Sequence, residues 1–345
     1  MNRYRLPAEW EAQSGIQLTW PHKLTDWESM LEEITDTYME MAREITKHEK
    51  LLVVAPVLSD LPEELLQLEN TQFFECPTND TWARDHAFLT LLATESSSPL
   101  LLDFQFNGWG EKFDAELDNA INKQLHEQGI VRGTYESHLD FVLEGGSIES
   151  DGKGTIFTTS QCLMAPHRNQ PLTQDQIEEQ LKQRLKAERV VWLNHGQLIG
   201  DDTDGHIDTI VRTAPHDTLL YIGCDTPEDE QYEDFLALEQ QLQALRKADG
   251  TPYRLLRLPM PDAIIENGER LPATYANFLV INDAVLVPTY AQPEKDLEAM
   301  QIISEAFPNR KIVGIDARAI ITQHGSIHCC AMQYPTGVLS SSFPQ

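Results

Sequence analysis

The chain has 345 residues and a formal net charge of -29 at pH 7, from 26 Lys and Arg against 55 Asp and Glu residues. No basic cluster could neutralise a row of phosphates, so the composition argues against nucleic acid and anionic membranes as partners. The five cysteines include no Cys-x-x-Cys pair, which indicates neither a disulfide scaffold nor a zinc ribbon. Without an apolar segment of signal-peptide or membrane-span length, the sequence predicts a cytoplasmic protein.

The first predicted element is a helix over about 26–48, where apolar residues recur at helical spacing between acidic ones. The short apolar run at 51–57 then predicts a buried strand. The same alternation continues to the C-terminal region. Further helices are predicted near 114–128, 173–186, 228–248 and 293–306, and further strands at 88–92, 100–106, 154–159, 189–193, 218–223, 278–288 and 311–316.

These elements form five helix-plus-strands units at intervals of about sixty residues, and no linker rich in Gly, Ser or Pro divides them. We therefore predict an α/β fold in a single domain over residues 1–345. Radial repetition of such units would gather loops around a central channel. A doubly wound sheet is also compatible with the periodicity alone.

A polar, glycine-containing run, His324-Gly325-Ser326-Ile327-His328, precedes Cys329 and Cys330. An isolated cysteine most often packs in a core, whereas a thiol after a turn can be a nucleophile. If the segment is extended, Cys330 and His328 face away from Cys329. We predict Cys329 as the nucleophile, with Cys330 as the alternative.

His206 and Asp208 lie two residues apart and would share one face of a strand. The acidic residues of 201–204 also suggest a metal loop, although the calcium-loop pattern is incomplete. An alternative function, from a different class of enzyme, is therefore a metal-dependent hydrolase that uses His206 with Asp202, Asp204 and Asp208. A non-catalytic module that binds small cations is a third hypothesis.

Two other polar segments have ordinary structural explanations when each is taken alone. Trp82 and Asp85 could belong to a turn whose aromatic side chain packs on the core, and Glu144 could be a solvated turn residue before two glycines. Together with a thiol and an imidazole, however, the carboxylates suit attack on a guanidinium carbon. The planar fork of N–H donors needs a carboxylate on each edge while the nucleophile approaches its face.

These segments together resemble the agmatine deiminase family, within the guanidine-modifying enzymes that include microbial peptidylarginine deiminases. The similarity extends nearly from end to end of the chain. It is carried by Leu6-Pro7-Ala8-Glu9-Trp10-Glu11, Trp20-Pro21, Trp82-Ala83-Arg84-Asp85, Phe106-Asn107-Gly108-Trp109-Gly110, Glu144-Gly145-Gly146-Ser147-Ile148-Glu149, Asp204-Gly205-His206-Ile207-Asp208, residues 271–279 and Ile327-His328-Cys329.

The resemblance implies a five-bladed pseudo-symmetric α/β propeller, the pentein fold, with its active site in the central channel. It implies that Cys329 is the nucleophile, that His206 is the general acid and base, and that Asp85 and Asp208 grip the guanidinium. It also implies a pocket lined by three further residues, Trp82, Glu144 and Asp202. The sequence departs from the family pattern at His324-Gly325-Ser326, where a glycine-rich run is usual, and at Cys330, where an aliphatic residue is usual.

The expected reaction is hydrolysis of agmatine to N-carbamoylputrescine and ammonia through a covalent cysteine intermediate, without metal or organic cofactor. Glu144 and Asp202 supply negative charge, and no evident Arg or Lys accompanies them, which favours a substrate with an amine tail over one with a carboxylate tail. Peptidyl-arginine is the alternative substrate. A homodimer is the expected assembly if the chain associates.

Overall fold

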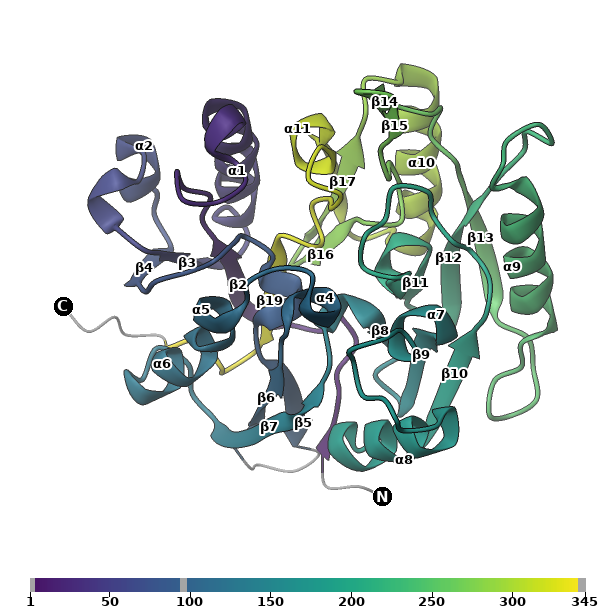
Figure 1. Cartoon of the computed structure of the whole chain (residues 1–345), viewed down its shortest axis with the longest axis horizontal. Helices are drawn as coiled ribbons and strands as arrows, with labels where there is room; N and C mark the ends of the chain where they lie inside the picture. Colours follow the sequence, from purple (N-terminus) through teal and green to yellow (C-terminus); the bar gives the residue numbers. More distant parts are fainter. Residues whose placement is uncertain (1–3, 94–97, 341–345) are drawn as a thin grey trace.

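The computed structural model describes residues 4–93 and 98–340 (Figure 1). Their strands form five sheets of three or four strands and one two-stranded ribbon. Each of the five sheets contains an antiparallel pair and a parallel pair that share a strand. Within the described residues this confirms an α/β fold of several mixed sheets, while the five-bladed propeller stays a prediction.

The strands of these sheets come from the following segments. The first sheet joins β19 (Ala331–Pro335), β2 (Gln13–Thr19), β3 (Lys50–Ala55) and β4 (Thr71–Glu75). The second joins β1 (Tyr4–Arg5), β5 (Leu89–Ala93), β6 (Leu100–Gln105) and β7 (Thr134–Val142). The third joins β8 (Ile148–Ser150), β9 (Thr155–Thr159) and β10 (Arg189–Leu193), and the fourth joins β11 (Val211–Ala214), β12 (Thr218–Gly223) and β13 (Arg254–Pro259). The fifth joins β16 (Leu279–Ile281), β17 (Ala284–Thr289) and β18 (Lys311–Asp316), and the ribbon pairs β14 (Ile265–Glu266) with β15 (Glu269–Arg270).

Helical crossovers join the parallel pairs of the five sheets, which cannot be connected by a tight hairpin. The longer crossover helices are α1 (Leu31–Ile45), α6 (Ile121–Glu127), α8 (Gln174–Leu185), α9 (Tyr232–Ala244) and α10 (Pro293–Ala306), and α1, α8, α9 and α10 lie toward the periphery of Figure 1. The shorter helices are α2 (Glu63–Leu66), α3 (Ala83–His86), α4 (Gly108–Glu111), α5 (Glu116–Asn119), α7 (Ser160–Leu163) and α11 (Arg318–Ile321). The 3₁₀ turns are η1 (Glu28–Met30), η2 (Leu58–Asp60), η3 (Gly145–Ser147) and η4 (Ile207–Thr209).

Local sequence explains the longer helices. In α1, Ile34, Tyr38 and Ile45 recur at helical spacing and are fully buried, so one face of the helix packs into the core. Helix α8 begins at a capping box, in which Thr173 and Gln176 bond to each other's backbone N–H groups. Among the described residues, no helix has both the length and the apolar character needed to cross a membrane.

Most predicted elements are confirmed within one or two residues, and four predictions need correction. The helix predicted over 26–48 is shorter, because the turn η1 precedes α1 and α1 ends at Ile45, and the helix predicted over 228–248 is α9, which is four residues shorter at each end. The helix predicted over 114–128 is two helices, α5 and α6. The strand predicted over 278–288 is a hairpin of β16 and β17, which turns at Asn282 and Asp283, and Asp283 has a left-handed φ of 59°.

The pairing of β19 with β2 joins opposite ends of the chain, with Ala331 opposite Leu18. It sets the position of the segment just before β19. There the backbone N–H of Arg84 in α3 donates to the carbonyl of Cys329 at 3.1 Å. Sheet pairing across more than 300 residues therefore brings Cys329 beside the segment that carries Asp85.

Candidate active site

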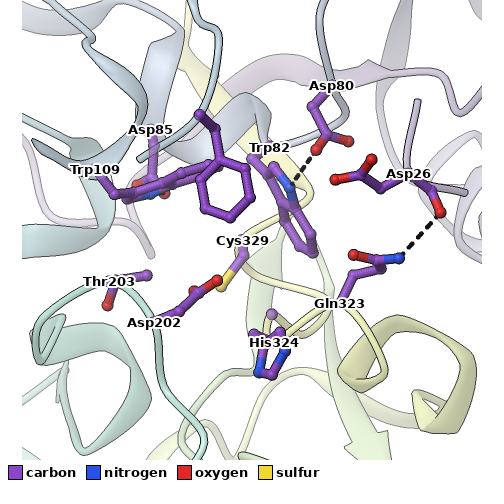
Figure 2. A pocket seen from close by; sticks show the side chains of 12 residues that line it. Asp26, Asp80, Trp82, Asp85, Trp109, Asp202, Thr203, Gln323, His324 and Cys329 are labelled. Carbon is purple, nitrogen blue, oxygen red and sulfur yellow. Dashed lines mark hydrogen bonds between the residues drawn. The ribbon is translucent and has the colours of Figure 1, made fainter. Parts of the chain in front are cut away.

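An open pocket of about 440 Å³ contains Cys329 (Figure 2). Among the described residues that line it, four are aspartates and none is Lys or Arg. The lining residues are Asp26, Asp80, Trp82, Asp85, Trp109, Phe113, Asp202, Thr203, Gln323, His324, Gly325 and Cys329. The pocket is therefore acidic and partly aromatic.

The Cys329 thiol lies at the base of this pocket and is 5% exposed. Its Sγ is 3.4 Å from Asn277 Oδ1 and 4.0 Å from Asp208 Oδ2. Burial, with the carboxylates of Asp208 and Asp85, raises the pKa of the thiol well above its ordinary value. The free protein therefore holds Cys329 as a thiol, and a cation that neutralises these carboxylates would favour the thiolate.

Asp85 is held at both carboxylate oxygens. Oδ1 accepts a hydrogen bond from the backbone N–H of Gly146 at 2.9 Å, and Oδ2 accepts one from Trp109 Nε1 at 2.9 Å. Trp109 has a left-handed backbone, with φ 55°, between two glycines that also have positive φ. This conformation is unfavourable for a bulky residue, and here it directs the indole N–H at Asp85.

His206 is 1% exposed and begins the turn η4. Its Nδ1 is 3.7 Å from Asp85 Oδ1, and its Nε2 is 4.0 Å from Glu144 Oε2. Burial lowers the pKa of His206, but the nearby Asp85, Cys162 and Glu144 outweigh that effect and raise the pKa well above 6.5. The imidazole is therefore poised as a proton donor.

Asp208 is fully buried and is held by a second histidine. Its Oδ2 is 2.7 Å from His328 Nδ1, whereas its Oδ1 has no hydrogen-bond partner within the described part of the chain. Burial raises the pKa of Asp208, but the hydrogen bond and positive charge of His328 lower it below its ordinary value overall. Asp208 is therefore an ionised acceptor with one free oxygen.

A hypothetical Cβ on Gly146 shows how closely three of these groups converge. It would lie 2.6 Å from His206 Nδ1, 2.9 Å from Asp85 Oδ1 and 3.1 Å from Asp208 Oδ2. Such distances are too short for carbon, so only glycine fits beside the three polar atoms. His206, Asp85 and Asp208, which are far apart in the sequence, therefore meet at one point beside the pocket.

The predicted pocket residues Trp82 and Asp202 both line the pocket, as Figure 2 shows. Trp82 Nε1 donates to Asp80 Oδ2 at 3.1 Å, and its ring packs 5.8 Å from that of Trp27. Burial, with the negative charge of Asp201, raises the pKa of Asp202 to about 6. Both side chains are thus placed to contact a ligand near Cys329.

Glu144 does not line the pocket. It is fully buried, and its Oε1 accepts a hydrogen bond from Arg168 Nε at 2.8 Å. The expectation that no Arg or Lys accompanies Glu144 is therefore wrong, because Arg168 reaches it from a different loop. Glu144 lies behind His206, away from the lining of the pocket.

Two expectations about side-chain direction have different outcomes. His206 and Asp208 are not on a strand, since they stand at the start of the 3₁₀ turn η4, yet both approach Gly146. Cys330 is fully buried in the core, and burial raises the pKa of its thiol to about 12. Of the two neighbouring thiols, Cys329 is the one that reaches the pocket.

The acidic segment at 201–208 uses two of its carboxylates to shape the loop. Asp201 accepts hydrogen bonds from the backbone of Thr203 and Gly205, and Asp204 pairs with Arg168 at 2.7 Å. The groups of potential metal ligands found within residues 4–93 and 98–340 include neither Asp202, Asp204 nor Asp208. The loop thus differs from the metal site that its composition suggested.

Several residues near Cys329 were not predicted as site residues. They are Asp26, Asp80, Trp109, Phe113, Thr203, Asn277, Gln323 and His324. Trp109 and His324 fall in segments that the sequence had singled out, one as a motif and the other as a departure from a motif. Asn277 lies within the similar stretch 271–279, but no local pattern distinguishes it there.

Comparisons with known proteins agree on one family. A family model described as Porphyromonas-type peptidyl-arginine deiminase matches residues 5–335. The chain is similar to the structure of a Porphyromonas gingivalis protein provisionally named an arginine deiminase, with 47% identity and a TM-score of 0.91 over 98% of this chain and 100% of that one. It is also similar to a Cys-to-Ser variant of a C. jejuni agmatine deiminase solved with substrate bound, with 38% identity and a TM-score of 0.90 over 97% of each chain. A Legionella pneumophila (strain Philadelphia 1) relative, provisionally named an agmatine deiminase, is 34% identical over 96% of this chain and 95% of its own length.

Proposed function

We propose that this chain, which belongs to the Porphyromonas-type peptidyl-arginine deiminase family, hydrolyses agmatine to N-carbamoylputrescine and ammonia. The observation that carries this proposal is the set of carboxylates around the Cys329 thiol. Cys329 Sγ lies in an acidic pocket, 4.0 Å from the carboxylate of Asp208, and Asp85 lines the same pocket. A planar cation can be held by two such carboxylates while the sulfur approaches its central carbon.

The first chemical step forms a C–S bond. The guanidinium offsets the negative charge of Asp85 and Asp208, so the Cys329 thiol releases its proton to solvent in the open pocket and the thiolate attacks the central carbon. Protonated His206 then donates its proton to the departing nitrogen. The C–N bond breaks, ammonia leaves, and an amidino-thioester-like intermediate remains on the sulfur.

Hydrolysis of that intermediate restores the protein. His206, now neutral, accepts a proton from a water molecule as the water oxygen bonds to the same carbon. The C–S bond breaks and its electron pair returns to Cys329, the added hydroxyl gives up its proton, the sulfur is reprotonated to the thiol, and the neutral ureido product leaves. This sequence requires no oxidant, reductant or organic cofactor.

The acidic lining supports an amine tail at the other end of the substrate. Asp26, Asp80 and Asp202 line the pocket with Asp85, and no Lys or Arg lines it within the described ranges. A primary ammonium is complementary to this lining, whereas a carboxylate tail would be repelled. Agmatine is therefore proposed ahead of free arginine and peptidyl-arginine.

The architecture proposed for the whole chain is a single domain built as a five-bladed α/β propeller, with the active site in its central channel. The recurrence of one antiparallel and one parallel pair in each of the five sheets supports it. The approach of loops from several sheets to Cys329 supports it too.

The deciding assay compares ammonia and ureido-product release from agmatine, arginine and an arginine-containing peptide at matched concentrations. We expect the largest kcat/KM for agmatine. A larger value for the peptide would reverse the substrate order, and no product from any of the three would refute the proposed reaction.

A matched pair of cysteine variants tests the covalent step. Cys329→Ala should lower kcat by at least about a thousandfold, because the nucleophile is lost. Cys330→Ala removes the neighbouring thiol, which packs in the core, and should retain activity within a few fold of wild type. Thiol-specific trapping of an intermediate on Cys330 would contradict the assignment.

A further inference from the structure

Among residues 4–93 and 98–340, two groups of three buried side chains have ligand atoms that all lie within 4.8 Å of one another. One consists of Glu9, Glu149 and His328. The other consists of Glu144, Cys162 and His206, and lies on the side of His206 that faces away from Asp85. Both are acidic and buried, and they differ in what occupies them.

A guanidinium occupies the first group. Arg212 Nη2 is 2.5 Å from Glu9 Oε2, and Arg212 Nε is 2.6 Å from Glu149 Oε1. His328 Nε2 is also 2.8 Å from Glu9 Oε2. The carboxylates already have cationic donors, so this group has no vacant place for a metal ion.

The second group has unused ligand atoms. Glu144 Oε2 and His206 Nε2 lack hydrogen-bond partners within residues 4–93 and 98–340, although Glu144 and His206 are at most 1% exposed. These two atoms are 4.0 Å apart, and Cys162, also fully buried, presents its Sγ to both. A buried polar atom without a partner is unfavourable, and a bound cation would satisfy both atoms.

From this arrangement we propose that Glu144, Cys162 and His206 bind a thiophilic divalent cation, with Zn²⁺ as the best fit, and that the cation inhibits the enzyme. Thiolate, imidazole and carboxylate are the ligands that Zn²⁺ takes in proteins, whereas Mg²⁺ and Ca²⁺ take oxygen. Tetrahedral coordination sets ligand atoms about 3.3 to 3.5 Å apart, so the 4.0 Å between oxygen and nitrogen must shorten only slightly. The cation inhibits the enzyme because His206 is the proton donor and acceptor of the reaction. When a metal ion binds its Nε2, that nitrogen can no longer exchange protons and the ring can no longer turn.

The three ligands are held in place by contacts of their own. Arg168 Nε donates to the other oxygen of Glu144, which leaves Oε2 directed at the cluster. Thr159 caps the helix of Cys162, and its hydroxyl also donates to the carbonyl of Gly205 at 2.6 Å. The thiol-bearing helix and the loop that precedes His206 are therefore joined by one side chain.

The binding test uses Cys329→Ala protein, so that the catalytic thiol is not available as a rival ligand. After removal of bound metal with a chelator, Zn²⁺ is titrated against a chromogenic chelator, and Co²⁺ is added separately to detect a sulfur-to-cobalt charge-transfer band. We expect one Zn²⁺ per chain and a Co²⁺ band that persists without Cys329. An absence of Zn²⁺ binding by Cys329→Ala protein would overturn the proposed site.

Second substitutions in that background identify the ligands. Cys162→Ser and Glu144→Gln should each weaken Zn²⁺ binding by at least about a hundredfold, and Cys162→Ser should remove the Co²⁺ band. Cys224→Ser removes a thiol outside the cluster and is the matched control. Equal Zn²⁺ affinity in the Cys162→Ser and Cys224→Ser proteins would refute the site, while circular dichroism establishes that each variant folds.

The claim that Zn²⁺ inhibits the enzyme rests on the proposed function and is measured separately from Zn²⁺ binding. Zn²⁺ should inhibit ammonia release from agmatine by the wild-type protein, and Cys162→Ser should need at least about a hundredfold more Zn²⁺ for half-inhibition relative to its own metal-free rate. Zn²⁺ binding without agmatine turnover would refute the proposed reaction but leave the site standing. Turnover with equal Zn²⁺ sensitivity in both proteins would refute the inhibitory role.

Discussion

Two buried histidines beside the pocket have opposite hydrogen-bonding environments. His328 uses both ring nitrogens, because Nδ1 lies 2.7 Å from Asp208 Oδ2 and Nε2 lies 2.8 Å from Glu9 Oε2. His206 makes no hydrogen bond to an oxygen or nitrogen atom at either ring nitrogen within the described residues, although two carboxylate oxygens lie 3.7 and 4.0 Å away and the Cys162 thiol is close. The contrast separates an imidazole that holds other groups in position from one whose nitrogens are left available for proton transfer.

The carboxylates show the same division. Glu9 is fully engaged, since Oε1 accepts from the backbone N–H of Val280 and Oε2 meets both His328 and Arg212. Asp208 is engaged at Oδ2 alone, and its Oδ1 has no partner in the described part of the chain. Asp208 is thus fixed through one oxygen while the other remains available to substrate.

The largest expected effect comes from making the same substitution at each histidine. His206→Asn should lower kcat by about a thousandfold, because the proton donor and acceptor is lost. His328→Asn should lower activity far less but reduce the free energy of unfolding by about 2–3 kcal/mol, because Glu9 and Asp208 lose a charge-assisted partner. Steady-state kinetics and urea unfolding of both variants measure these effects. A larger loss of kcat in His328→Asn than in His206→Asn would contradict the two assigned roles.

The Gly146→Ala variant tests the convergence of polar atoms at one point. The added methyl would meet His206 Nδ1, Asp85 Oδ1 and Asp208 Oδ2 at 2.6–3.1 Å, so these groups must move apart. A displacement of this size should lower kcat/KM by about a hundredfold while secondary structure is retained. Gly129→Ala, at a glycine with open space around it and a positive φ of 71°, adds backbone strain without displacing a site group and is the control for general destabilisation. Equal activity in the two variants would contradict the proposed geometry.

A double-mutant cycle tests whether His328 acts through Asp208. His328→Asn should lower kcat/KM for agmatine by about tenfold when Asp208 is present, since a loosened carboxylate grips the guanidinium less well. In an Asp208→Asn background the same change should lower kcat/KM less than twofold. A tenfold loss in both backgrounds would mean that His328 affects activity through general stability, and thermal unfolding of all four proteins measures that directly.

Local pattern predicted the parts of this molecule that depend on local physics. Helix α10 occupies the predicted residues 293–306, because Pro293 starts it and apolar residues recur along it. The predicted residues Cys329, Asp85, Trp82 and Asp202 all line one pocket. Cys329 and Asp85 were recognisable because their chemistry fits a guanidinium, whereas Trp82 and Asp202 were assigned to the pocket by the family resemblance.

The contacts that organise the site were beyond local pattern. The contact of Glu9 with His328 joins residues 319 positions apart, and the contact of Glu144 with Arg168 joins residues 24 apart in different elements. Nothing in the spacing of either pair indicates that the two side chains meet. The expectation of a strand at His206 failed for a related reason, since the two-residue period has structural meaning only where neighbouring strands hold the chain extended.

The smallest expected effect is a pH dependence of agmatine affinity. Burial and the neighbouring Asp201 raise the pKa of Asp202 to about 6, so its carboxylate is ionised above that pH and becomes protonated below it. Attraction to the amine tail is therefore present at pH 7 and lost as the pH falls to 5, which should weaken binding by up to about tenfold. Direct binding to Cys329→Ala protein measures this without contributions from the chemical steps.

Other titrating and charged groups near Asp202 limit how this pH profile is assigned. Asp80 also lines the pocket and has a pKa raised by burial to about 6, while Lys112 supplies positive charge near Asp202. In the Asp202→Asn protein, agmatine affinity should vary less than threefold between pH 5 and 7, and Asp80→Asn in the same background should remove what remains. An unchanged tenfold dependence in Asp202→Asn would exclude Asp202 as the group that meets the amine and would leave Asp80 as the acidic contact.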